Sequence, residues 1–353
     1  MQRVRSTVRI AALFVAMRLT AACAGASDVA PVGTLGDSAA QTVDADSSAA
    51  TAPDDGQAIA EDTSVPDQPP SPLELAGQVD STNLMSSIAA LEGFGTRHTD
   101  TDGDDKARDW LVERLNALGL AADLDTFAAG TSMASNVIAR KPGVEDATVV
   151  YIFSAHYDST SSTPKTFAPG ADDNASAVAA VLEAARILEP VAFRHSLWFV
   201  FTAAEEQGSL GSQHMVSWLK DQGVNVQGVI APDMIGYWPL GDDDRLDLLG
   251  DKGSKELVDF TAAMADALGL PYKIWIHHDY CYGDDHTSFQ EAGFAAISPM
   301  DCVEAHNVAA SGESTPHYHQ TSDTLATLNM PFTTRVAQVL VATLAALGVP
   351  VAP

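Results

Sequence analysis

Basic residues are scarce in this sequence of 353 amino acids. It has 19 Lys and Arg against 47 Asp and Glu, which gives a formal net charge of −28. Nucleic acids and anionic membrane surfaces are bound by clustered cations, so this balance argues against both as partners. Long apolar runs are also missing near the N-terminus, where the run 10–17 is far shorter than the roughly 20 residues of a spanning helix.

Several sequence motifs of common enzyme classes are absent. The chain contains no His-Glu-x-x-His, no Gly-x-Ser-x-Gly, no phosphate-binding P-loop and no Gly-x-Gly-x-x-Gly. These absences argue against single-helix zinc sites, serine hydrolases of the nucleophile-elbow type, P-loop nucleotide hydrolases and dinucleotide-binding domains.

The first residues have the composition of an export signal. Arg3, Arg5 and Arg9 precede a short apolar run and then small residues, so we interpret 1–22 as a signal that directs the protein out of the cytoplasm. The segment 19–23 resembles a lipoprotein cleavage box, with Thr20 an imperfect match. A lipid anchor at Cys23 and an ordinary signal peptide therefore both remain open.

Cysteine is rare, with three residues in total. If Cys23 is removed or lipidated, Cys281 and Cys302 remain as an even pair. An oxidising compartment would allow a disulfide between them, and two unpaired buried thiols are the alternative.

The chain divides by composition into a tether and a folded part. Residues 24–72 contain no Lys or Arg and few bulky apolar side chains, so we predict a disordered acidic tether over 23–72. Residues 73–353 are expected to form one domain, which we expect to be monomeric.

Apolar segments with strand character alternate with amphipathic segments in the folded part. Strands are predicted over 135–140, 147–154, 196–202 and 226–233, and helices over 81–91, 104–118, 174–188, 205–220, 255–268 and 333–347. This alternation indicates a three-layer α/β/α sandwich around a mainly parallel sheet.

Polar clusters lie at the ends of three of these strands. His156 and Asp158 follow the second strand, Glu205 and Glu206 follow the third, and Asp233 is the last residue of the fourth. Ligands bind beyond the carboxyl ends of such strands. Crowded carboxylates would repel one another there, and a pair of metal ions removes that conflict. Nitrogen and oxygen ligands suit zinc, although manganese and cobalt accept similar sites.

The ordered motifs resemble those of the M28 family of zinc exopeptidases. They are His-x-Asp at 156–158, Gly-Ala-Asp-Asp-Asn-Ala-Ser at 170–176, Glu-Glu-x-Gly-Ser-x-Gly-Ser at 205–212, Asp-Met-Ile-Gly at 233–236 and His-x-x-x-Asp-Thr at 319–324. The resemblance covers about 73–353. It implies a secreted aminopeptidase that hydrolyses the N-terminal peptide bond of peptides with two Zn²⁺ ions.

The resemblance also implies a role for individual residues. His156 and Asp233 would bind one zinc ion, Glu206 and His319 the other, and Asp172 would bridge them. Glu205 would be the general base and Tyr318 a hydrogen-bond donor to the oxyanion. Asp158 would orient His156, and Asp285, with His286, would be a supporting residue outside the ligand set. The peptide bond Asp172–Asp173 is expected to be cis.

Substrate preference rests on weaker signals. Met234, Tyr237, Tyr282 and Phe289 lie near the motifs and are predicted to line an apolar pocket for the first side chain, with core positions as the alternative. No basic cluster stands out to receive a terminal carboxylate, which favours an aminopeptidase over a carboxypeptidase. A glutaminyl cyclase with one zinc ion and a non-catalytic binding domain remain as other functions.

Overall fold

The computed structural model describes residues 68–239, 245–277, 283–301 and 315–352. The predicted export signal, the tether up to residue 67 and a lipid anchor at Cys23 lie outside these ranges. Cys281, Cys302 and Tyr282 lie outside them as well, so the disulfide remains a prediction.

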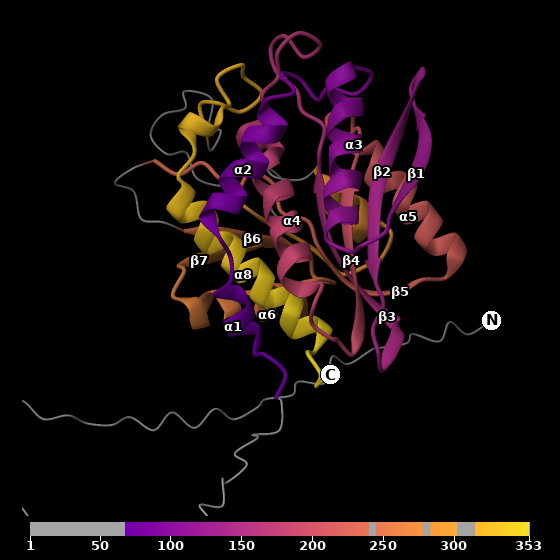
Figure 1. Ribbon diagram of the computed structural model, residues 1–353, viewed down its shortest axis with the longest axis vertical. Coiled ribbons are helices and arrows are strands. Elements are labelled where there is room, and N and C mark those ends of the chain that lie inside the picture. Colours follow the sequence, from indigo (N-terminus) through magenta and orange to yellow (C-terminus); the bar gives the residue numbers. More distant parts are fainter. Residues whose placement is uncertain (1–67, 240–244, 278–282, 302–314, 353) are drawn as a thin grey trace, which may run out of the picture. The chain divides into compact units, whose positions relative to one another are not determined.

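A single mixed sheet forms the centre of the described domain (Figure 1). Its strand order is β1-β2-β4-β3-β5-β8-β6-β7. The central strands β4, β3, β5 and β8 are parallel, whereas β2 and β6 run antiparallel to their neighbours β4 and β8. The strands are β1 (Ala122–Ala129), β2 (Ser132–Lys141), β3 (Asp146–His156), β4 (His195–Thr202), β5 (Asn225–Ile230), β6 (Leu246–Gly250), β7 (Tyr272–Ile276) and β8 (Ala296–Met300).

Helices cover both faces of the sheet, which confirms the predicted three-layer arrangement (Figure 1). One face carries α1 (Pro72–Ala76), α2 (Ser81–Glu92), α3 (Asp102–Ala117), α4 (Ala177–Leu188), α6 (Lys255–Leu268) and α8 (Met330–Gly348). The other carries α5 (Leu210–Gln222) and α7 (Asp285–Glu291). Short helical turns at η1 (Ala171–Ser176) and η3 (Leu325–Thr327) complete the set.

Helix α8 is long and apolar enough to cross a membrane by length and composition alone, but 67% of its apolar stretch is buried inside the molecule. Its side chains Phe332, Val336 and Leu340 are fully buried in the main core. Its hydropathy is therefore that of a helix packed between a sheet and other helices.

The structure differs from the sequence-based expectation in two respects. Strands β1, β6, β7 and β8 and helices α1 and α7 were not predicted, because these segments carry little periodic signal. Helix α5 begins at Leu210 rather than Glu205. Ala204 and Ser209 have positive φ angles of 56° and 54°, so the segment between β4 and α5 is a turn.

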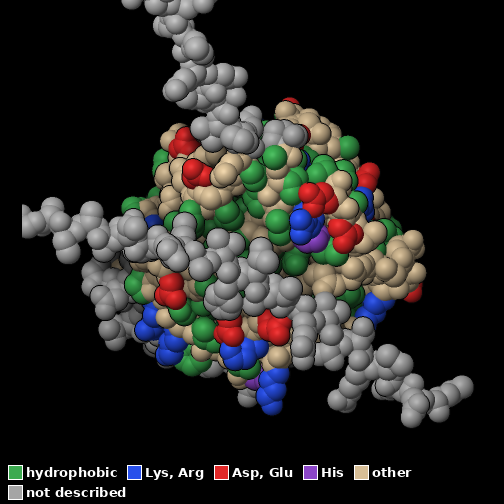
Figure 2. All heavy atoms as spheres, turned by 90° about the horizontal axis from the view of Figure 1, so that it is seen from below, with side chains coloured by type: hydrophobic (Ala, Val, Ile, Leu, Met, Phe, Trp, Pro, Cys, Tyr) green, Lys and Arg blue, Asp and Glu red, His purple; other side chains and the backbone are tan. Residues whose placement is uncertain are grey.

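On the face shown in Figure 2, Lys and Arg side chains form small groups beside Asp and Glu rather than one basic area. Ion pairs of this kind join Arg140 to Asp123 and Arg194 to Glu145. This distribution agrees with the acidic composition.

Candidate metal centre

The predicted site residues meet at one edge of the sheet. His156 is the last residue of β3, opposite Thr202 at the end of β4, and Asp233 follows the neighbouring parallel strand β5. Glu205 and Glu206 follow β4 at the same edge. Because parallel strands bring their carboxyl ends to one side, residues far apart in sequence become neighbours there.

Two groups of ligand-type atoms form at this edge. His156 Nε2 lies 3.3 Å from Asp173 Oδ1 and 3.5 Å from Asp233 Oδ2. His319 Nε2 lies 3.3 Å from Asp173 Oδ2 and 3.0 Å from Glu206 Oε2. Within each group all ligand atoms lie within 4.8 Å of one another. Asp173 belongs to both groups, one oxygen facing each.

The shared carboxylate is that of Asp173, and the expectation for Asp172 is corrected. Asp172 instead accepts backbone hydrogen bonds from Gly236 (2.7 Å) and Tyr237 (3.1 Å). Its side chain therefore ties η1 to the loop after β5. The cis peptide bond is correspondingly Asp173–Asn174 rather than Asp172–Asp173.

The protonation tendencies of the two acids agree with this correction. Burial, reinforced by the charge of Asp323, raises the pKa of Asp172 well above its usual range. Burial acts in the same direction on Asp173, but its interactions with the adjacent imidazoles of His156 and His319 outweigh burial and lower the pKa of Asp173. The two adjacent acids differ in this way because Asp173 lies beside both imidazoles and Asp172 does not.

The donor set fits a pair of divalent cations. His156 Nε2, Glu206 Oε1 and Asp233 Oδ1 are buried and have no hydrogen-bond partner. Burial raises the pKa of Glu206 to about 8, with the charge of Asp173 adding to the effect, and burial also raises the pKa of Asp233. Burying several carboxylates together without a compensating positive charge is unfavourable in free energy. Zn²⁺ supplies that charge and prefers carboxylate and imidazole ligands.

Asp158 supports this centre from behind. Its carboxylate accepts the backbone N–H groups of Glu205 (3.0 Å) and Glu206 (3.2 Å), and its Oδ1 lies 3.6 Å from His156 Nδ1. The main-chain oxygen of Asp158 is 3.2 Å from the same ring nitrogen. These contacts orient His156 with Nε2 toward the centre, which is the role predicted for Asp158.

We therefore expect Asp158→Asn to weaken zinc binding by about 10- to 100-fold, which is the usual effect of losing a hydrogen-bond partner of a metal ligand. The amide replaces one acceptor oxygen by an N–H₂ group that faces the backbone N–H groups. Competition with a chromogenic chelator measures the effect. The control is Asp146→Asn at the opposite end of β3 from His156, where the carboxylate accepts the backbone N–H of Thr148. An unchanged zinc affinity in Asp158→Asn would contradict this role.

Asp323 holds the segment that carries the shared ligand. Its two carboxylate oxygens accept the backbone N–H groups of Asp172 (2.9 Å) and Asp173 (3.1 Å). The sequence places Asp323 in the His319 motif but does not indicate what it contacts. Only the fold shows that it positions a segment 150 residues earlier.

Glu205 lies beside the centre without joining either ligand group. Its Oε2 is 4.0 Å from His156 Nε2, and its Oε1 is 3.1 Å from the hydroxyl of Ser209. The same hydroxyl lies 2.8 Å from the main-chain oxygen of Gly283. Burial raises the pKa of Glu205 well above its usual range. A carboxylate so placed can accept a proton near neutral pH.

The other predicted supporting residues occupy different positions. The ring of Tyr318 stacks on that of His319 with centroids 3.7 Å apart. Asp285 is buried at the start of α7 and accepts a hydrogen bond from Thr202. The adjacent His286 is also buried, which lowers its pKa to about 4. Asp285 therefore anchors α7 to β4.

The predicted pocket residues divide between the site and the core. Met234 packs with Leu249, Met300, Trp275 and Tyr318 in an apolar group next to the centre. Tyr237 is half-buried with its ring against His317.

Phe289 is not a pocket residue. It has an exposed fraction of 0% and packs against Phe294 in the core on the α5 and α7 face. Its position in α7 turns the side chain into the layer between helix and sheet.

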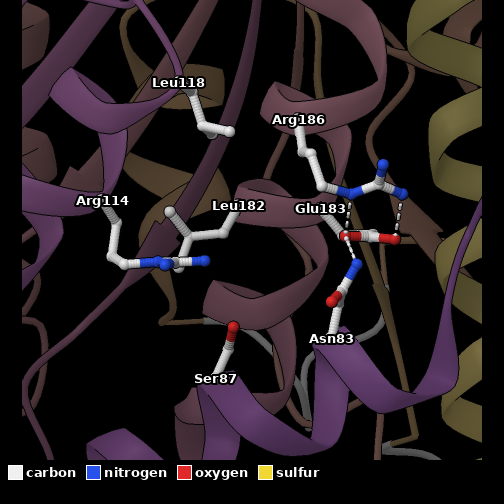
Figure 3. A pocket seen from close by; sticks show the side chains of 7 residues that line it. All are labelled: Asn83, Ser87, Arg114, Leu118, Leu182, Glu183 and Arg186. Carbon is white, nitrogen blue, oxygen red and sulfur yellow. Dashed lines mark hydrogen bonds and ion pairs between the residues drawn. The ribbon is translucent and has the colours of Figure 1, made fainter.

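A separate small pocket lies between α2, α3 and α4 (Figure 3). It is lined by Asn83, Ser87, Arg114, Leu118, Leu182, Glu183 and Arg186. The carboxylate of Glu183 already accepts hydrogen bonds from Arg186 and from the backbone N–H of Asp80. This pocket is thus held by a satisfied ion pair and lacks the imidazoles found at the centre.

Comparison with known sequences identifies relatives. A model of peptidase family M28 matches residues 136–344, more than half of the chain. A probable zinc metalloprotease of Pyrenophora tritici-repentis is 29% identical over 342 residues, covering 78% of this chain and 69% of the relative. One of Pyricularia oryzae is 30% identical over 281 residues, covering 65% of this chain and 56% of the relative.

Solved structures share the fold at lower identity. The LapA aminopeptidase of Legionella pneumophila has a TM-score of 0.67 at 21% identity, with 78% of this chain and 74% of that chain covered. The zinc aminopeptidase BSAP of Bacillus subtilis has 0.67 at 16% identity, with coverage of 77% and 96%. Glutaminyl cyclase of Porphyromonas gingivalis has 0.64 at 22% identity, with coverage of 76% and 99%. With its motifs in order and the family model matched over most of the folded domain, the chain belongs to peptidase family M28 and is a hydrolase of the metallopeptidase type.

Proposed function

We propose that the protein is an aminopeptidase that uses two zinc ions to hydrolyse the N-terminal peptide bond of peptides. The observation that carries this proposal is the carboxylate of Asp173, whose two oxygens face two separate ligand groups. His156 and Asp233 would complete one zinc site, and Glu206 and His319 the other. The likeness to LapA and BSAP supports the aminopeptidase assignment.

The chemistry follows from the positions of the side chains around the ligand groups. Bound zinc ions supply Lewis-acid polarisation of the scissile carbonyl and make a nearby water more acidic. Glu205, whose Oε2 lies 4.0 Å from His156 Nε2, accepts the proton of the attacking water and delivers it to the leaving nitrogen. Burial raises the pKa of Tyr318, so its hydroxyl stays protonated and can donate to the oxyanion.

Negative charge around the centre favours a free amino terminus. Asp284, at the start of α7, is partly buried, and its pKa is raised by burial and by the charge of Asp233. In their ionised forms Glu205 and Asp284 would attract the α-ammonium group of a peptide, whereas Asp233 is a proposed zinc ligand whose charge the metal compensates. This supports an aminopeptidase over a carboxypeptidase.

The apolar group of Met234, Leu249 and Met300 supports a preference for an apolar first residue. It adjoins the centre through Met234, next to Asp233, and through Tyr318, next to His319. Methionine side chains adapt to differently shaped apolar partners, so we propose that leucine and methionine are both accepted.

We expect rapid hydrolysis of leucine p-nitroanilide by the zinc-loaded protein. N-acetyl-leucine p-nitroanilide should react at least about 100-fold more slowly, because the acetyl group removes the ammonium charge and fills its place. Release of p-nitroaniline measures both rates, with a chelator-treated sample as control. Equal rates would contradict the exopeptidase assignment. One zinc ion per chain together with cyclisation of N-terminal glutamine would favour the glutaminyl cyclase alternative.

A further inference from the structure

Arg97 is a buried cation that the proposed reaction does not use. It lies between α2 and α3 and has an exposed fraction of 0%. Burial lowers its pKa to about 10, so the guanidinium remains charged at neutral pH. A fully buried arginine is unusual unless its charge and donors are satisfied, and its partners therefore indicate its role.

The guanidinium joins two loops that carry metal ligands. Nε donates to the main-chain oxygen of Tyr157 at 2.7 Å. Nη1 and Nη2 donate to the main-chain oxygens of Pro169 at 2.7 Å and Gly170 at 2.8 Å. Tyr157 lies directly after His156, and Gly170 opens the turn that leads to Asp173. The planar guanidinium therefore fixes the separation of the two loops, because its donors bond to carbonyl oxygens on both of them.

The backbone of Arg97 makes a second connection between the same loops. Its N–H donates to the hydroxyl of Ser159 (3.0 Å), which itself donates to the main-chain oxygen of Ala168 (2.8 Å). Gly170 has φ = 53°, and a Cβ at this position would lie 2.8 Å from Arg97 Nη2 and 2.4 Å from the main-chain oxygen of Asp173. The space around the guanidinium is thus fully occupied, and a side chain at position 170 would clash with it.

The electrostatic surroundings explain why a cation is tolerated. The three hydrogen-bond acceptors are neutral carbonyls, and the charge is compensated by Asp323 and Asp158, with smaller contributions from Asp173 and Glu206. A lysine would keep the charge, but its compact ammonium cannot reach three fixed carbonyls in one plane.

We propose that Arg97 is a positioning residue that sets the spacing of the loops carrying His156 and Asp173. The ligand atoms of the group formed by these two residues and Asp233 would then be in place before a metal ion binds. This inference rests on the metal centre of the proposed function. It does not depend on which peptide bond is cleaved.

The test compares Arg97→Lys with Arg186→Lys. Arg186 also donates to three acceptors, the two oxygens of Glu183 and the main-chain oxygen of Gln78, but it lines the separate pocket of Figure 3. We expect Arg97→Lys to raise the zinc dissociation constant about 10- to 100-fold in chelator competition. At saturating zinc, we expect kcat to fall with KM within twofold of wild type. Arg186→Lys should match wild type in each measurement.

Amide hydrogen exchange of the zinc-free proteins gives a readout that is independent of activity. The N–H groups of Ala171, Asp172 and Asp173 are bonded to Asp323, and we expect them to exchange slowly in wild type and faster in Arg97→Lys. If wild type without zinc leaves them unprotected, the loop is not preset and the inference is overturned. Zinc affinity and exchange rates of Arg97→Lys that equal wild type overturn it as well.

A milder variant covers the case in which Arg97→Lys does not fold. Ser159→Ala removes only the hydroxyl between Arg97 and Ala168, and we expect a two- to tenfold rise in the zinc dissociation constant. An unchanged constant in that variant contradicts the inference. Failure of wild type to bind zinc would instead overturn the metal centre itself, whereas zinc binding without peptide hydrolysis would reject only the proposed substrate.

Discussion

Glu205→Gln is expected to retain both zinc ions and to lose activity by about 10²- to 10⁴-fold in kcat. The carboxylate of Glu205 lies 4.0 Å from His156 Nε2 but belongs to neither ligand group. The glutamine side chain of the variant should therefore leave metal binding intact. The amide cannot accept a proton from water at neutral pH. Steady-state kinetics on leucine p-nitroanilide and zinc analysis of the same sample measure the two effects.

The control for this variant is Glu256→Gln, an exposed position in the first turn of α6. It should have wild-type kcat and zinc content. A Glu205→Gln protein with more than a tenth of the wild-type kcat would exclude Glu205 as general base. Loss of zinc would instead show that Glu205 is a ligand.

Asp173→Asn is expected to abolish high-affinity binding at both zinc sites and to reduce activity to background. Each carboxylate oxygen of Asp173 faces a different imidazole at 3.3 Å, so one substitution removes a ligand from both groups. The negative charge that separates two adjacent dications is lost as well. Zinc content after gel filtration, measured by mass spectrometry, gives the result.

Asp172→Asn is the matched comparison, one residue earlier in the same turn. Its remaining side-chain oxygen can still accept the N–H of Gly236, and only the weaker contact with the N–H of Tyr237 is lost. The raised pKa of Asp172 also makes the neutral amide a closer substitute here than for an ionised acid. We expect two zinc ions and at least a tenth of the wild-type activity. The opposite pattern, with zinc lost from Asp172→Asn and kept by Asp173→Asn, would restore the sequence-based assignment.

The comparison of these two acids shows where sequence reasoning reached its limit. The motif at 170–176 correctly predicts that an acid of this turn lies near His156. It does not determine which of two adjacent carboxylates faces inward, because this depends on the backbone of one turn. Asp173 and Asn174 leave the helical region of φ and ψ inside η1, and this change directs Asp173 to the centre and Asp172 to Gly236.

Phe289 and Arg97 illustrate the same limit for packing. Phe289 is close in sequence to Asp285, but α7 places its side chain in the core on the α5 and α7 face. Arg97 carries no motif, and its contacts with Tyr157, Pro169 and Gly170 span 60 to 73 residues. Distance in the chain does not measure distance in the fold, so neither position could be assigned from local pattern.

The order of the longer helices and of strands β2, β3, β4 and β5, the three-layer class and the chemical types gathered after strands β3, β4 and β5 follow from local sequence. Apolar periodicity and strand-end polar clusters are properties of short segments, and parallel strands bring those ends together in any order of pairing. The tertiary structure alone decides that Asp173 faces both imidazoles, that Asp323 and Arg97 hold its turn, and that β6 reverses direction beside β8. These features depend on contacts between distant segments, whose geometry is set only when the whole core packs.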